Sequence, residues 1–353
     1  MEDVLCNISA WRYWRTPPQV LALCAPVPAK ETDRHRKRLK QCDLVCESLG
    51  LPLHITTSDP SLRTSNSVIC RHLRRGQLPF GSVCETEHGL QVESPLMAVF
   101  GMIGSLSIVS AAMMLYELCG TFSVFEPSKR MEAMLKRAYD EGLLSERYGW
   151  SRVKDAAGRV TNLWKRPPLV ELDELDRFCR QMEGRWGAQK FREAARMVVG
   201  VCASPLEVRT VILLIWSRRK GGFGFSGVET NARISLPGVA SQIAQQYVAY
   251  ADILLTSRSG GRQAIIECQG RVVHGRAGAG ISDAERATAL QSLGYSVIMV
   301  THQQVSDAVQ FERIVRTVCR LLEDPYRPKS EHGKGIEAKL RREVFIDWED
   351  LGT

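Results

Sequence analysis

The sequence predicts an α/β protein in which a mixed sheet is flanked by helices. Between residues 204 and 322, helix-like and strand-like segments alternate, which is typical of an α/β unit rather than of an all-helical or all-β domain. The chain has 353 residues, more than one ordinary core contains, so two or three domains are expected.

Changes of pattern along the chain divide it into four segments. Residues 1–126 are expected to form a smaller α/β module, and residues 127–202 a mainly helical connector with a boundary or hinge at Pro167-Pro168. Residues 203–323 are expected to contain the mixed sheet. Residues 324–353 are polar and contain proline, which predicts a solvated tail.

Charge and cysteine content indicate the class of partner and the compartment. The net charge of +8 favours an anionic partner, of which nucleic acid is the commonest, although solvated lysines and arginines give the same balance. No secretion signal is recognised at the start, and eleven cysteines are an odd number, so we expect a reducing cytoplasm. The cysteines form no pair with metal-ligand spacing, and Cys70 is interpreted as a small core residue.

The most apolar segment, Leu96 to Met114, carries no charge and approaches the length of a membrane span. It contains Gly101, Gly104 and several serines, and it follows Ser94-Pro95, which is a good helix start. We therefore predict one buried helix or two short ones, and no membrane span.

The predicted sheet follows a helix that begins at Ser204-Pro205, with Ser204 as its N-cap, and ends near Trp216. The later elements are expected as strands at about 231–236, 246–257 and 262–269, a helix at 283–293, a strand at 295–301 and a helix at 306–322.

Two acidic residues are expected to face each other in one hairpin. Residues 258–261 have the composition of a short loop, so Ser257 can pair with Arg262. That register places Asp252 directly opposite Glu267, with Cβ atoms roughly 5 Å apart, where like charges repel. A hard divalent ion, Mg²⁺ or Mn²⁺, would compensate two carboxylates held between apolar strands.

The alternative is that Asp252 and Glu267 are neutralised by arginines, such as Arg262, Arg271 or Arg286. The predicted register also matters, because a slip of one residue would place the two acids on opposite faces of the sheet. Both alternatives remain open at the level of sequence.

The order of Asp252, an apolar strand and then Glu267-Cys268-Gln269 resembles the core motif of PD-(D/E)XK nucleases. The wider pattern over residues 203–323 is similar to the very-short-patch-repair-like branch of that superfamily. The further matching features are the Ser204-Pro205-x-Glu207 helix start, Ala251-Asp252-Ile253, His274, Asp283-x-x-Arg286 with Leu290, Gly294-Tyr295-x-Val297-Ile298 and Thr301.

This resemblance implies a restriction-endonuclease-like fold and metal-dependent hydrolysis of a phosphodiester, in which the ion lowers the pKa of bound water. Asp252 and Glu267 would coordinate the ion, and Glu207 would approach from the preceding helix. Glu207 also suits a helix N-terminus, where the dipole favours negative charge. His274 would contact phosphate or assist proton transfer, or it is a surface or capping histidine.

Gln269 departs from the family pattern, because it occupies the position of the motif lysine. Glutamine has no charge and cannot act as a base, although it can orient a water molecule. This substitution favours a second hypothesis, a catalytically weakened nuclease-fold protein that binds DNA or regulates a toxin–antitoxin-like system. Asp283 and Arg286 are expected to form a local ion pair at the start of their helix.

Several basic residues are candidates for contact with nucleic acid. Arg218, Arg219 and Lys220 follow the helix that carries Glu207, and Arg271 follows the motif strand. The basic segment 147–166 also contains Trp150 and Trp164, whose rings would suit stacking on bases.

The sequence therefore predicts a DNA endonuclease acting in repair, restriction or phage defence, with RNA as the alternative substrate. A homodimer remains open, because one active site cuts both strands only by dimerisation or by two nicks. The N-terminal part loosely resembles an abortive-infection antitoxin-type module, on the basis of His54 to Thr56 and of Ser94-Pro95 before the apolar helix.

Overall fold

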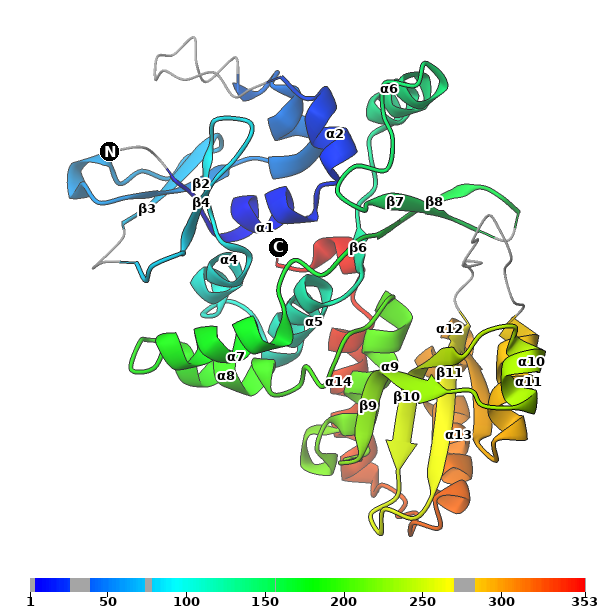
Figure 1. Ribbon diagram of the computed structural model, residues 1–353. Coiled ribbons are helices and arrows are strands. Elements are labelled where there is room, and N and C mark those ends of the chain that lie inside the picture. Colours follow the sequence, from blue (N-terminus) through cyan, green and yellow to red (C-terminus); the bar gives the residue numbers. More distant parts are fainter. Residues whose placement is uncertain (1–3, 26–38, 74–77, 156, 270–282, 353) are drawn as a thin grey trace.

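The computed structural model describes residues 4–25, 39–73, 78–155, 157–269 and 283–352. Within these residues the chain is mixed α/β, with three separate sheets and helices that pack against them (Figure 1). The predicted α/β class is confirmed at this level.

The N-terminal part contains a five-stranded sheet of order β3-β2-β1-β5-β4. Its strands are β1 (Val4–Leu5), β2 (Leu53–Thr57), β3 (Ile69–Leu73), β4 (Val83–Glu85) and β5 (Gln91–Glu93). The segments near this sheet are α1 (Asn7–Arg15), α2 (Pro18–Leu23) and the π-helical turn η1 (Val45–Leu49). β2 pairs in parallel with β3, which lies at the edge of the sheet.

The apolar segment forms two short helices, α4 (Pro95–Met102) and α5 (Ile108–Cys119). α4 begins at Pro95, and the Ser107 side chain caps the start of α5 by accepting a hydrogen bond from Ser110 N. Both helices are buried in the main core, so of the two predicted arrangements the structure has the two short buried helices. In the part of the chain that the structure describes, no helix has the length and apolar character needed to cross a bilayer.

The connector contains three helices, as expected, and also two strands of a small antiparallel sheet of order β6-β8-β7. Its strands are β6 (Phe122–Val124), β7 (Ser151–Lys154) and β8 (Val160–Lys165). The helices of this part of the chain are α6 (Lys129–Asp140), α7 (Leu172–Gln181) and α8 (Ala188–Ala195), of which α8 packs against α5 and α7. Trp150 and Trp164 are buried, so the prediction that they stack on bases is wrong.

The C-terminal part contains a four-stranded sheet of order β12-β11-β10-β9. In chain order, the elements of this part are α9 (Pro205–Ile215), β9 (Val228–Ser235), α10 (Val239–Ala244), β10 (Val248–Thr256), β11 (Gln263–Gln269), α11 (Asp283–Ser292), β12 (Ser296–Thr301), α12 (His302–Ser306) and α13 (Ala308–Leu321). β9, β10 and β11 run antiparallel to one another, and β12 is parallel to β11.

Helices cover both faces of this sheet (Figure 1). On one face, Ile253 and Ile266 belong to the same core as residues of α9 and α13. On the other face, Ile265 packs with Ala289 and Leu290 of α11 and with residues of α10. The acids that the sequence singles out thus lie on the central strands of a sheet with apolar layers on both sides.

The prediction of a solvated tail after residue 323 is wrong. This segment contains α14 (Glu331–Val344), and its apolar residues Leu340, Val344 and Trp348 are buried in the main core. Trp348 Nε1 donates to Glu117 Oε2 of α5 at 2.5 Å. The polar composition was misleading because the buried face of α14 includes Glu337, which pairs with Lys329 and Arg341 rather than with solvent.

The main core crosses the boundaries expected at residues 126 and 202. It joins α4, α5, α7 and α8 to α9, α13 and α14 without interruption. The Arg15–Glu117 ion pair (2.9 Å, with both side chains buried) further ties α1 to α5.

Candidate functional site

The register of the β10–β11 hairpin determines how the two predicted acids lie. Ile253 pairs with Ile266, and Ser257 N donates to Arg262 O at 2.9 Å, as the loop composition predicts. Continued by one residue beyond this last pair, the same register sets Asp252 against Glu267, and Asp252 N donates to Glu267 Oε1. The predicted register is therefore confirmed, and the one-residue slip did not occur.

Asp252 and Glu267 each form a hydrogen bond with the backbone of the strand that carries the other acid. Cys268 N donates to Asp252 Oδ2 at 2.8 Å, and Asp252 N donates to Glu267 Oε1 at 3.4 Å. Glu267 is only 2% exposed, whereas Asp252 is half-buried. Two carboxylates are thus held close together by the backbone of adjacent strands.

Glu207, from the first turn of α9, adds a third carboxyl group, which is buried like that of Glu267. Its Oε2 accepts from Ala203 N at 2.7 Å, and its Oε1 accepts from the Ser204 hydroxyl at 2.8 Å. Glu207 N in turn donates to Ser204 Oγ at 3.3 Å. Glu207 therefore fulfils the helix-start role that was the alternative in the sequence, and it also lies within electrostatic range of Asp252.

The negative charge of Asp252 acts on both Glu207 and Glu267. Burial, and then the negative charge of Asp252, raises the pKa of Glu207 to about 8. The same two causes raise the pKa of Glu267 to about 7, against an opposing effect of Arg286. Carboxyl groups with such raised pKa values are common at functional sites. Buried acidic groups that lie close together repel one another and disfavour the folded state, unless a positive charge compensates that repulsion.

Arg286 of α11 compensates one of these charges. Its Nη2 lies 2.5 Å from Glu267 Oε2, and its side chain is 26% exposed. The alternative in which an arginine neutralises Glu267 is therefore present in the structure. Arg286 was expected to pair with Asp283, whose side chain lies outside the described residues.

The ligand atoms of Asp252, Glu267 and Glu207 do not all lie within 4.8 Å of one another. Among the described residues, the one group of three or more His, Cys, Asp or Glu side chains whose ligand atoms all lie within 4.8 Å of one another is His54, Cys70 and His72. A divalent ion at the acid site would therefore be held by part of the group, and the facing pair Asp252 and Glu267 is best placed to hold it.

Gln269 lies at the exposed end of β11, next to Thr301 of β12. Strand alternation puts its side chain on the same side of the sheet as Glu267. His274 and Arg271, which were expected near this strand end, lie outside the described residues.

The basic group at residues 218–220 lies at the other end of α9 from Glu207, separated from it by roughly 12 Å of helix. Arg218 Nη2 donates to the carbonyl of Arg327 at 2.9 Å, and Lys220 pairs with Glu193. Arg219 is exposed. The structure thus does not bring these residues together with the acids.

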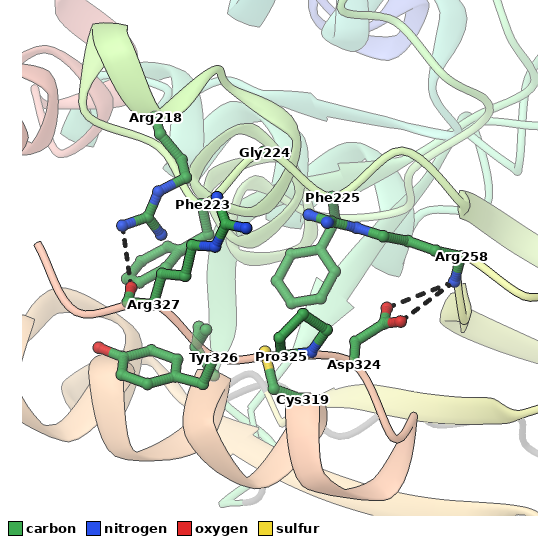
Figure 2. Close-up of a pocket in the computed structure, with 11 residues that line it drawn as sticks. Arg218, Phe223, Gly224, Phe225, Arg258, Cys319, Asp324, Pro325, Tyr326 and Arg327 are labelled. Atoms are coloured by element: carbon green, nitrogen blue, oxygen red, sulfur yellow. Dashed lines mark hydrogen bonds between the residues drawn. The ribbon is translucent and has the colours of Figure 1, made fainter.

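Figure 2 shows a surface pocket at that remote end of the C-terminal part. Arg218, Arg258 and Arg327 border it together with the Phe225 and Tyr326 rings, and Arg258 N donates to the Asp324 carboxylate at 3.3 and 3.4 Å. This pocket lies near the turn of the β10–β11 hairpin and does not include the three acids.

The sequence interpretation missed one group of potential ligands. His54, Cys70 and His72 meet on β2 and β3, and Cys70 is half-buried rather than a core residue. The available signal was the Cys-x-His spacing, which puts both side chains on one face of a strand. The parallel pairing that brings His54 beside them could not be read from local sequence.

Comparisons of this chain with protein-family models, with curated proteins and with solved structures found no match.

Proposed function

We propose that the protein is a metal-dependent phosphodiesterase that cuts DNA, with Asp252 and Glu267 as ligands for Mg²⁺ or Mn²⁺. The observation that carries this proposal is the contact of Asp252 with the buried Glu267 across β10 and β11, with Glu207 close enough for Asp252 to raise its pKa. Oxygen ligands of this kind suit a hard divalent ion.

A divalent cation suits the charges of Asp252, Glu267 and Glu207. Two of the three carboxyl groups are hard to ionise because of burial and of Asp252, and a cation between Asp252 and Glu267 would remove that repulsion. When bound, Mg²⁺ supplies positive charge against a phosphate and lowers the pKa of a water molecule. Gln269 would orient that water from the exposed end of β11.

The order of elements around the acids supports a restriction-endonuclease-like fold for residues 203–323. α9 carries Glu207, the antiparallel strands β9, β10 and β11 follow, and α11 leads into β12, which is parallel to β11. This is the order of helix and strand segments on which the resemblance to PD-(D/E)XK nucleases rests. The net charge of +8 supports a polyanionic substrate.

The test is incubation of supercoiled plasmid with the purified full-length protein and Mg²⁺ or Mn²⁺, with EDTA as the blank. We expect nicked or linear product that requires the ion. Asp252→Asn and Glu267→Gln should abolish it, because each removes a ligand charge with little change of shape. Glu229→Gln, which changes an exposed acid on β9 of the same sheet, should leave cleavage unchanged. Full activity of either active-site variant would refute the assignment.

A second function is favoured by two observations, the neutral Gln269 in place of a lysine and the Arg286 side chain already paired with Glu267. In this case the protein would bind DNA without cutting it, as a regulatory component. The two functions differ in the plasmid experiment: retained binding in a gel-shift assay, without cleavage under either ion, would select the second. Parallel reactions with single-stranded RNA would show whether RNA is preferred.

A further inference from the structure

We propose that His54, Cys70 and His72 bind a Zn²⁺ ion at the edge of the N-terminal sheet. One potential ligand atom from each of the three residues lies within 4.8 Å of the other two. This site lies on β2 and β3, away from the acids of the C-terminal sheet, and it does not depend on the nuclease proposal.

The parallel pairing of β2 with β3 creates the group. His54 is the register partner of Cys70, and Thr56 is the partner of His72. Cys70 and His72 are two residues apart on β3, so their side chains leave the same face of the strand. His54, beside Cys70 on the next strand, contributes the third ligand to that face.

The separations suit tetrahedral zinc. Zn–N bonds of about 2.0–2.1 Å and Zn–S bonds of about 2.3 Å place two tetrahedral nitrogens and one sulfur roughly 3.3–3.6 Å apart. His54 Nδ1 and His72 Nε2 lie 3.0 Å apart, so a small opening of the pair would admit an ion. Their rings are stacked with centroids 5.0 Å apart and are inclined by 29°.

The surroundings of the two histidines disfavour a positive charge on their rings. Burial, followed by the charge of His72 and then of Arg12, lowers the pKa of His54 to about 4. Burial and then Arg63 lower the pKa of His72. Burial and positive charge thus act on both rings in the same direction, and it is the neutral form of imidazole that binds zinc.

The donor set distinguishes zinc from the ion proposed for the acid site. Two imidazoles and one thiolate are soft or borderline ligands, whereas Mg²⁺ prefers oxygen. Three protein ligands leave a fourth tetrahedral position for water or another group. A hydrogen bond between two neutral imidazoles would explain the His54–His72 contact alone, but it leaves the convergence of the Cys70 thiol unexplained.

The test uses Co²⁺ as a spectroscopic substitute for Zn²⁺ in the purified full-length protein stripped of metal. Tetrahedral Co²⁺ with a thiolate ligand gives strong visible bands and a sulfur-to-cobalt charge-transfer band. We expect both in the wild type, with one equivalent of Zn²⁺ displacing the cobalt. Cys70→Ser should remove the charge-transfer band. Cys84→Ser, which changes another half-buried cysteine on β4 of the same sheet, should retain it.

Affinity for Zn²⁺ gives the second readout. Loss of an outer-shell partner of a zinc ligand costs about 10–100-fold in affinity, so loss of a ligand in His72→Gln should cost at least about 100-fold. His88→Gln, in the same part of the chain, should bind as the wild type does. Absence of tetrahedral cobalt bands in the wild type would overturn the proposal, as would an unchanged spectrum in Cys70→Ser. Because the wild-type spectrum decides by itself, the test does not depend on the variants folding.

Discussion

Glu207 is a buried carboxyl group that the folded protein holds in its protonated form more strongly than the unfolded chain does. Burial and the charge of Asp252 raise its pKa from an ordinary value of 4.5 to about 8. The stability that follows from the bound proton is complete below pH 4.5 and is lost as the pH rises through about 8. At about 1.36 kcal/mol per pKa unit, the loss reaches about 5 kcal/mol above pH 8.

Replacing this carboxyl group by an amide measures that loss directly. Glu207→Gln keeps an oxygen that can accept from Ala203 N but carries no charge. We expect the variant and the wild type to have similar free energies of unfolding at pH 5. At pH 8 the variant should be more stable by about 2–5 kcal/mol, where the lower figure allows for relaxation around the ionised group. Urea denaturation followed by circular dichroism at pH 5, 6, 7 and 8 gives the comparison.

Two controls sharpen the measurement. Glu331→Gln changes an exposed acid in the first turn of α14 and should alter the free energy of unfolding by less than about 0.5 kcal/mol at every pH. Millimolar Mg²⁺ should stabilise the wild type at pH 8 more than it stabilises Glu207→Gln, because an ion relieves the same repulsion. If Glu207→Gln follows the wild type at all four pH values, the charge of Glu207 is not opposed in the folded state and the reasoning fails.

Two other substitutions test separate parts of the structure. Gln269→Lys places a positive charge at the exposed end of β11, on the side of Glu267. It should raise Mg²⁺-dependent plasmid cleavage by at least about tenfold, because a single donor that stabilises a transition state is worth about 10²–10³-fold in related contexts. Unchanged cleavage would show that this position does not face the phosphate. Glu117→Ala leaves the buried Arg15 without its carboxylate and removes the acceptor of Trp348 Nε1, so it should lower the free energy of unfolding by about 3–5 kcal/mol in urea denaturation. A loss below about 1 kcal/mol would mean that the C-terminal segment is not anchored through Glu117.

Elements that depend on neighbouring residues were predicted well. Ser204-Pro205 begins α9, and the glycines and serines between residues 101 and 107 separate α4 from α5. These signals act within a few residues, through a capping hydroxyl, a fixed proline φ angle or a break in side-chain packing. The predictions that failed concern the segments after residue 147 and after residue 323, whose state depends on distant partners.

The small sheet and the C-terminal helix show why local patterns were insufficient there. β8 pairs with β6, about 40 residues earlier, so its short strand has an incomplete local signal. α14 is polar by composition, yet Glu337 is buried because Lys329 and Arg341 satisfy it. Whether a charged residue is solvated or paired depends on what the fold places beside it.

The sequence by itself determined the pairing of Asp252 with Glu267, because a short loop fixes the register of the two strands that it joins. Only the tertiary structure decided that Arg286 reaches Glu267 from α11, and that His54 meets Cys70 and His72 across two parallel strands. A parallel pair has no tight turn to set its register, so packing of the whole sheet against its helices must do so.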